Sequence, residues 1–190
     1  MAKAFTLLGA LAVGIAASTM ARPAAAQAFG NQGDLAFSAE RLSGIYFYDE
    51  QESQTIITAG IAPPVATALT LPRLGIDYFV IDNLSIGGAI GFGDNNPEHG
   101  GAYSGGLIAP RVGYAIEFTK VIGFWPRGGF TYRNFGGDEE FALTLEAMFY
   151  VAPVQHFAVT FGPLMDLGIV GTGPEAKNFA LISGGLLFWM

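Results

Sequence analysis

The sequence predicts an all-β protein: an eight-stranded, antiparallel, up-and-down transmembrane β-barrel that follows a cleavable N-terminal signal peptide. Three observations carry this prediction. The 190 residues include only 13% charged residues, with 51% hydrophobic residues and 27 glycines, whereas soluble domains contain about 25% charged residues. Apolar residues recur at every second position in segments of roughly ten residues, as in barrel strands. Short and long connections alternate between these segments.

The first 26 residues have the features of a secretory signal peptide, which leaves residues 27–190 as the barrel domain. Lys3 supplies a positive charge ahead of "FTLLGALAVGIAA", an apolar run of 13 residues. That run is too short to span a bilayer as a helix, which needs about 20 residues. Ala24 and Ala26 provide an A-x-A cleavage site, and the alternative is an uncleaved membrane anchor. Cleavage after Ala26 removes Lys3 and one arginine and changes the formal net charge from −7 to −9, which argues against a nucleic-acid partner.

Eight segments of the barrel domain show the period-two alternation of strands with one apolar face. They cover residues 35–48, 71–81, 84–92, 106–117, 121–133, 140–151, 156–166 and 178–190. Short turns follow the second, fourth and sixth segments, and the other connections are longer: 49–70, 93–105, 134–139 and 167–177. Outer-membrane barrels have short periplasmic turns and longer extracellular loops. Both termini of the mature chain are therefore expected on the periplasmic side.

Charged residues within six of the segments fall on the face opposite the larger apolar stripe. A basic residue that faces lipid at the bilayer midplane costs about 2–4 kcal/mol, so these charges are expected to face the lumen. The interior of an eight-stranded barrel is just wide enough for side chains to fill. We therefore expect a structural charge network that closes the lumen, made of Arg73, Asp77, Arg111, Glu117, Arg127, Arg133, Glu146 and Asp166.

Three predicted strands contain the pattern Pro-Arg-x-Gly, beginning at Pro72, Pro110 and Pro126. Alternation places the proline on the lipid face and the arginine on the lumen face. The glycine shares the arginine's face and leaves room for a long side chain in a narrow barrel. Because proline lacks an N–H group and costs one ladder hydrogen bond, we expect irregular pairing near Pro110 and Pro126.

The first strand carries Glu40 and Arg41 side by side, and strict alternation would turn one of them toward lipid. A β-bulge adds one residue and changes the phase of a strand. We therefore expect a bulge or bend between Ala39 and Leu42, while the pattern alone does not say which of the two charged residues faces the lumen.

The chain ends in "SGGLLFWM", which has Ser183, Gly185 and Phe188 at the positions of an outer-membrane C-terminal strand, although Met190 stands where an aromatic residue is usual. With the signal peptide and the "DYFVIDNLSIGG" hairpin at Asp77–Gly88, the chain resembles the small OmpA/OmpX-type outer-membrane β-barrels of the outer membrane protein β-barrel domain family. The resemblance covers essentially all of the mature chain. It implies a monomer in a Gram-negative cell envelope, with outer-membrane lipid, lipopolysaccharide and the barrel-assembly machinery as partners.

The residues offer little support for catalysis or for a bound cofactor. There is no cysteine, and neither His99, in a predicted surface loop, nor His156, at the start of a predicted strand, has a serine on the lipid-facing outer rim with an obvious acidic partner, as nucleophilic catalysis would need. The acidic loop clusters, such as Asp138–Glu140, are interpreted as solvated, with divalent cations bridging them to lipopolysaccharide as the alternative. We expect a non-enzymatic barrel without cofactor or metal, in a structural or surface-interaction role. The alternatives are a narrow or gated channel for small solutes, a lipid-modifying barrel enzyme and, for the fold, a soluble lipocalin-like barrel.

Overall fold

A computed structural model describes residues 29–49, 53–59, 71–95, 103–135, 137–171 and 177–190. The predicted signal peptide, its cleavage site and His99 lie outside these residues. Within them, no helix is long and apolar enough to cross a membrane.

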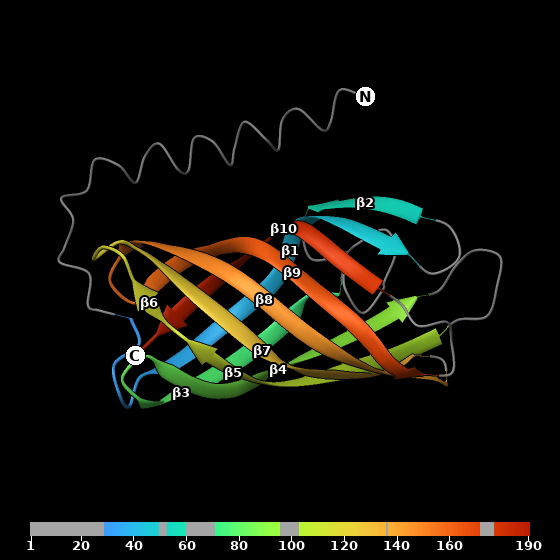
Figure 1. Cartoon of the computed structure of the whole chain (residues 1–190), viewed down its shortest axis with the longest axis horizontal. Helices are drawn as coiled ribbons and strands as arrows, with labels where there is room; N and C mark the ends of the chain where they lie inside the picture. Colours follow the sequence, from blue (N-terminus) through green and yellow to red (C-terminus); the bar gives the residue numbers. More distant parts are fainter. Residues whose placement is uncertain (1–28, 50–52, 60–70, 96–102, 136, 172–176) are drawn as a thin grey trace, which may run out of the picture.

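The chain forms a closed antiparallel barrel (Figure 1). Each of the eight barrel strands pairs with the barrel strands before and after it, and β10 pairs with β1 to close the wall, from Ala36 opposite Trp189 to Asp49 opposite Lys177. The predicted all-β, eight-stranded, up-and-down fold is confirmed. Its strands are β1 (Leu35–Asp49), β3 (Arg73–Ile81), β4 (Leu84–Asn95), β5 (Tyr103–Tyr114) with its continuation β6 (Ile116–Glu117), β7 (Ile122–Phe135), β8 (Asp138–Val154), β9 (Phe157–Gly171) and β10 (Lys177–Trp189).

One further strand, β2 (Ser53–Ala59), lies in the segment that we predicted to be a loop. It pairs with β1 from Ser43 opposite Ala59 to Asp49 opposite Ser53, whereas β3 pairs with the first part of β1, up to Glu40. The second half of β1 therefore has β10 on one side and β2 on the other. The neutral stretch "SQTIITA" has no lumen-facing charge pattern, so period two alone did not reveal this strand.

Three short connections lie at the end of the barrel that also holds Phe29 and the C-terminus, here called the short-turn end (Figure 1). Leu35 and Met190 exchange backbone hydrogen bonds of 2.9 and 3.1 Å there. In two of the turns, Asn83 and His156 adopt positive φ values of 69° and 61°, a conformation that asparagine tolerates well. The opposite end is called the long-loop end.

The predicted strict alternation of short and long connections is wrong at one place. Strands β7 and β8 stay paired as far as Phe135 opposite Asp138, so only two residues, Gly136 and Gly137, connect them. Gly137 has a φ of 94°, and glycine at positive φ is what a two-residue hairpin turn requires. The connection is therefore two residues long where the sequence was read as a loop of six residues.

The barrel is apolar outside and polar inside. In β3, the outward residues Leu74, Ile76 and Tyr78 are 66%, 49% and 49% exposed, whereas Arg73 and Asp77 between them are 2% and 1% exposed. A soluble lipocalin-like barrel would have the opposite arrangement, and the structure contradicts that alternative. Large exposed hydrophobic residues occur on every one of the eight barrel strands, so a continuous apolar surface surrounds a charged interior.

Candidate functional site

The β1 strand brings two adjacent charges into the lumen through a local change of phase. Its register with β10 shifts between Ala39 and Ser43, and Arg41 has a φ of 58°. The predicted bulge is therefore confirmed. As a consequence, Glu40 and Arg41 are 4% and 2% exposed, so both side chains point inward instead of one of them facing lipid.

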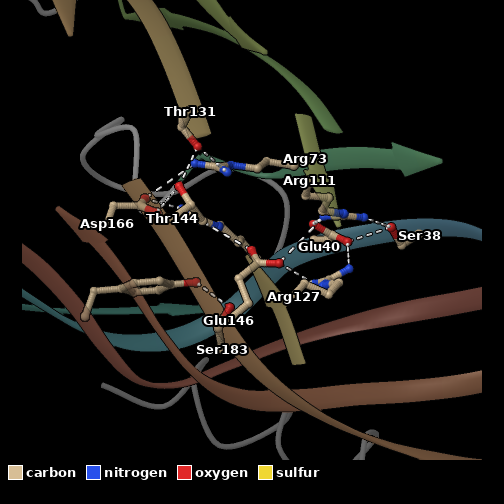
Figure 2. A network of polar contacts seen from close by, with 12 residues as sticks. Ser38, Glu40, Arg73, Arg111, Arg127, Thr131, Thr144, Glu146, Asp166 and Ser183 are labelled. Carbon is tan, nitrogen blue, oxygen red and sulfur yellow. Dashed lines mark hydrogen bonds and ion pairs between the residues drawn. The ribbon is translucent and has the colours of Figure 1, made fainter. Parts of the chain in front are cut away.

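Glu40 lies at the centre of a first group of charges, between two arginines from the opposite wall (Figure 2). Its two carboxylate oxygens accept hydrogen bonds from Arg111 Nη1 at 2.8 Å and Arg127 Nη1 at 2.6 Å. Ser38 Oγ donates to the same carboxylate at 2.7 Å. Arg111 also forms a bidentate salt bridge with Asp77, in which Nε donates to Oδ1 at 3.0 Å and Nη2 donates to Oδ2 at 2.6 Å.

Asp166 is the centre of a second group. Arg41 donates to it from Nη1 at 2.9 Å and from Nη2 at 3.3 Å, and Arg73 Nη2 lies 3.5 Å from it. Arg73 Nη1 donates to Thr131 Oγ1 at 3.2 Å, and Thr144 Oγ1 donates to Asp166 at 2.8 Å. Because the single hydroxyl proton of Thr144 goes to Asp166, Thr131 is the donor in their 2.7 Å contact, so a relay of hydrogen bonds runs from Arg73 to Asp166.

Glu146 joins the two groups into one network. Its Oε2 lies 2.8 Å from Arg127 Nη2 and 3.7 Å from Arg111 Nη1, and its Oε1 lies 3.5 Å from Arg41 Nη2. Within the part of the chain that the structure describes, the network contains four arginines and four carboxylates. All eight side chains are buried, and their formal charges cancel. Buried charges are tolerated when they are paired and hydrogen-bonded. The members of this lumen charge network are Glu40, Arg41, Arg73, Asp77, Arg111, Arg127, Glu146 and Asp166.

A small cavity lies beside the network. The cavity bordered by Arg73, Arg111, Arg127 and Glu146 measures about 10 Å³, which is room for one water molecule at most. The side chains come from β1, β3, β5, β7, β8 and β9, so they reach into the lumen from most of the circumference.

Six of the eight predicted lumen residues lie in this network, and two do not. Arg133 is bonded to Glu140 closer to the long-loop end, where the two side chains are 20% and 11% exposed. Glu117 is exposed and is not part of the network, so its predicted place there is wrong. It has the same alternation phase as Arg111 but lies on β6, after the break in the strand at Ala115, where it pairs with Gly123 of β7.

Sequence reasoning also missed the hydrogen-bonding partners Ser38, Thr131 and Thr144. It did not predict that Glu40 and Arg41 both face the lumen. Hydroxyl residues on a lumen face were visible as a pattern, but the donor that each carboxylate needs depends on which strands face each other across the barrel. The contact between Arg41 and Asp166 joins residues 125 positions apart, a pairing that alternation within one strand cannot reveal.

The Pro-Arg-x-Gly pattern has a geometric reason that involves arginines of other strands. A Cβ added at Gly75 would lie 2.6 Å from Arg111 Nη2, one at Gly113 would lie 3.0 Å from Arg127 Cγ, and one at Gly129 would lie 2.9 Å from Arg111 Cβ. Each glycine therefore makes room for the arginine of another strand. The sequence predicted that the glycine leaves room for a long side chain, and the structure shows that this side chain comes from another strand.

The prolines disturb the ladder between β5 and β7 without shifting its register. Pairing is interrupted at Ala109–Pro110 and again at Tyr114–Ala115, opposite Pro126, while the same register continues on both sides of each gap. The expected irregularity is therefore a local loss of pairs. Pro110 is exposed on the outer face and Pro126 is half-buried, while the arginines that follow them point inward.

An aromatic layer separates the charge network from the short-turn end. The Arg127 guanidinium lies 4.6 Å from the centre of the Trp125 ring, a cation–π distance, and Trp125 Nε1 donates to Ser85 Oγ at 3.3 Å. Trp125 packs with other buried rings in one cluster, including Phe29, Phe79, Tyr150 and Trp189. Among the described residues, no group of three His, Asp or Glu side chains is arranged to hold a metal ion.

Comparisons with known proteins find the fold but no close relative. No family model matches the sequence, and no curated protein sequence matches it. The N-terminal β-barrel domain of Pseudomonas aeruginosa OprF aligns with a TM-score of 0.51 at 12% identity, over 84% of this chain and 98% of that one. Ail, the attachment invasion locus protein of Yersinia pestis, gives 0.51 at 8% identity, over 84% and 99% of the two chains. Neisserial surface protein A gives 0.50 at 13% identity, over 83% and 99%.

The likeness to these three proteins is a likeness of fold, since the sequences have diverged almost completely. The chain therefore has the fold of the small OmpA/OmpX-type outer-membrane β-barrels.

Proposed function

We propose that this chain is an integral outer-membrane protein whose lumen is closed by the charge network and whose role is structural or in surface interaction. The observation that carries the proposal is the combination of a fully buried, charge-balanced lumen with an apolar outer wall. An apolar outer wall of this extent is stable in lipid and would drive aggregation in water. A lumen filled by paired side chains leaves no continuous path for solutes.

The orientation follows from the connections. Short turns face the periplasm in barrels of this architecture, so the short-turn end and both termini of the mature chain are assigned to the periplasmic side. Tyr78, Tyr114 and Phe118 are exposed near that end, at 49%, 49% and 57%, and aromatic residues favour the interface between lipid and water. This supports a membrane boundary at the level of these side chains.

The remaining parts of the proposal concern processing and partners. The signal peptide is removed after Ala26, and the chain is a monomer in contact with outer-membrane lipid and lipopolysaccharide. The barrel-assembly machinery reads β10, the strand that closes the barrel against β1. Ail is named for attachment and invasion, which is consistent with a surface-interaction role for a barrel of this fold.

We propose no catalytic activity and no cofactor. The imidazole of His156, the one histidine within the described residues, has its Nδ1 2.9 Å from the Trp189 carbonyl oxygen, so it is engaged in holding the C-terminal strand. Its position in a turn at the short-turn end is remote from the outer leaflet, where a lipid-modifying site acting on lipopolysaccharide would lie.

Planar-bilayer recording tests the closed lumen. The mature chain, refolded in detergent and inserted into the bilayer, is expected to give no discrete conductance steps. Reproducible steps of one size would contradict the closed lumen and favour the channel alternative. Mass spectrometry of lipid A from expressing cells tests the enzyme alternative, because an altered acylation pattern that depends on expression would contradict the non-enzymatic role.

A further inference from the structure

The Phe29 side chain fills the mouth of the barrel at the short-turn end, where it packs among aromatic rings of the wall. Its ring makes edge-to-face contacts with four other rings, at centroid distances of 5.1 Å to Phe79, 5.1 Å to Trp125, 5.0 Å to Tyr150 and 5.3 Å to Trp189. Edge-to-face geometry at this distance is the favourable arrangement for aromatic pairs. The four rings, here called the aromatic cup, come from four different strands, and Phe29 itself is 4% exposed.

A short turn that precedes β1 holds this ring in place. Gly30 accepts a hydrogen bond of 2.6 Å from the Asn83 backbone N–H, and Gly33 donates one of 2.9 Å to the Phe79 carbonyl. The Gln32 N–H donates to Asp82 Oδ1 at 2.8 Å. The turn, residues 29–34, is thus fastened to the hairpin between β3 and β4 by a few bonds at the edge of the barrel, outside the continuous strand ladder.

The cup contains two polar groups that would gain hydration if Phe29 left. The Tyr150 hydroxyl and Trp189 Nε1 are buried in the cup without a hydrogen-bond partner among the described residues. A buried polar group without a partner is unfavourable, and water that enters the mouth when Phe29 leaves would satisfy both. Hydration of these two groups offsets part of the cost of exposing the phenylalanine ring.

We propose that residues 29–34 form a reversible stopper, with Phe29 as the in-chain ligand of the aromatic cup, which closes and opens the periplasmic mouth below the charge network while the barrel stays folded. The stopper controls water access to Trp125, on whose ring Arg127 lies. The predicted cleavage after Ala26 leaves only Gln27 and Ala28 ahead of Phe29 in the mature chain. The proposal does not depend on whether the lumen conducts.

Tryptophan fluorescence reports directly on the cup, because the two tryptophans of the chain, Trp125 and Trp189, both belong to it. In the refolded barrel, Phe29→Ala is expected to increase acrylamide quenching about threefold or more, since a neighbouring ring no longer excludes the quencher. Phe92→Ala is the matched control, because Phe92 is 77% exposed on the outer wall towards the long-loop end, and it should leave quenching unchanged. Unchanged quenching in a folded Phe29→Ala barrel would overturn the proposal.

Hydrogen exchange of the unaltered protein gives a second test that no folding failure of a variant can obscure. The amides of Gly33 and Asn83, which hold the turn, are expected to exchange about 100-fold faster than amides in the β7–β8 ladder, because local opening needs less free energy than global unfolding. Equal protection of the two sets would show that the turn opens only when the barrel unfolds, and the stopper would then be a fixed part of the core.

Discussion

The charge network makes a quantitative prediction for the conservative substitution Glu40→Gln. The Glu40 carboxylate accepts three hydrogen bonds, from Arg111, Arg127 and Ser38, at 2.6 to 2.8 Å. All three partners are donors, so the amide NH₂ of glutamine would face a donor whichever way it is turned. The substitution also leaves the buried lumen with a net positive charge, because four arginines would then face three carboxylates.

Removing one partner of a buried ion pair costs about 3–5 kcal/mol. Arg111 keeps its bidentate bond to Asp77 and Arg127 keeps Glu146 at 2.8 Å, so the lower end of that range applies. We expect Glu40→Gln to lower the free energy of unfolding by about 3 kcal/mol, which is roughly 100-fold in the unfolding equilibrium constant.

Urea unfolding of the barrel in lipid vesicles, followed by tryptophan fluorescence, measures this difference. Glu117→Gln is the matched control, since Glu117 is exposed and outside the charge network and the same chemical change there should cost less than about 0.5 kcal/mol. A loss below about 1 kcal/mol for Glu40→Gln, or equal losses for both variants, would refute the reasoning that a paired, dry network holds the lumen together.

Three further results are expected. Gly129→Ala should destabilise the barrel by about 1–3 kcal/mol by overpacking, because the added Cβ would lie 2.1 Å from the Pro110 carbonyl oxygen. Gly128→Ala is the control, since the Cβ added there points outward and meets only an ordinary contact at 3.5 Å. Equal melting temperatures of the two variants would contradict the close packing at Gly129. Ile90→Arg, at a position 45% exposed on the outer wall, should cost about 2–4 kcal/mol in vesicle refolding if that wall faces lipid at depth, and Ile81→Arg, next to the short turn of the β3–β4 hairpin, about 0–1 kcal/mol. The destabilisation by Glu40→Gln should change by less than about 0.5 kcal/mol between roughly 0.1 and 1 M salt, since buried pairs are little screened; a strong salt dependence would indicate a hydrated lumen.

Most of the architecture could be predicted from the sequence because the lipid and the lumen impose opposite requirements on alternate residues. In β3, alternation alone assigns Arg73, Gly75 and Asp77 to the lumen face and Leu74 and Ile76 to the lipid face. The structure has the same phase. The turn at Asn83 was visible because a barrel strand must end where the alternation stops, whereas His156, which lies in a turn, was predicted to open a strand. The same local reasoning failed for Glu117, since alternation gives the phase of a residue but not how deeply its side chain is buried.

The sequence by itself determined the all-β class, the eight barrel strands and the side of the wall on which most charges lie, because period two is a property of each strand alone. Only the tertiary structure decided how Glu40 and Arg41 both turn inward at the bulge, which arginine meets which carboxylate, and that Phe29 fills the cup of rings at the short-turn end. Those contacts depend on the stagger between strands around a closed barrel. Closure brings residues far apart in sequence to the same height in the lumen, and the register that does so is set by all the strands together.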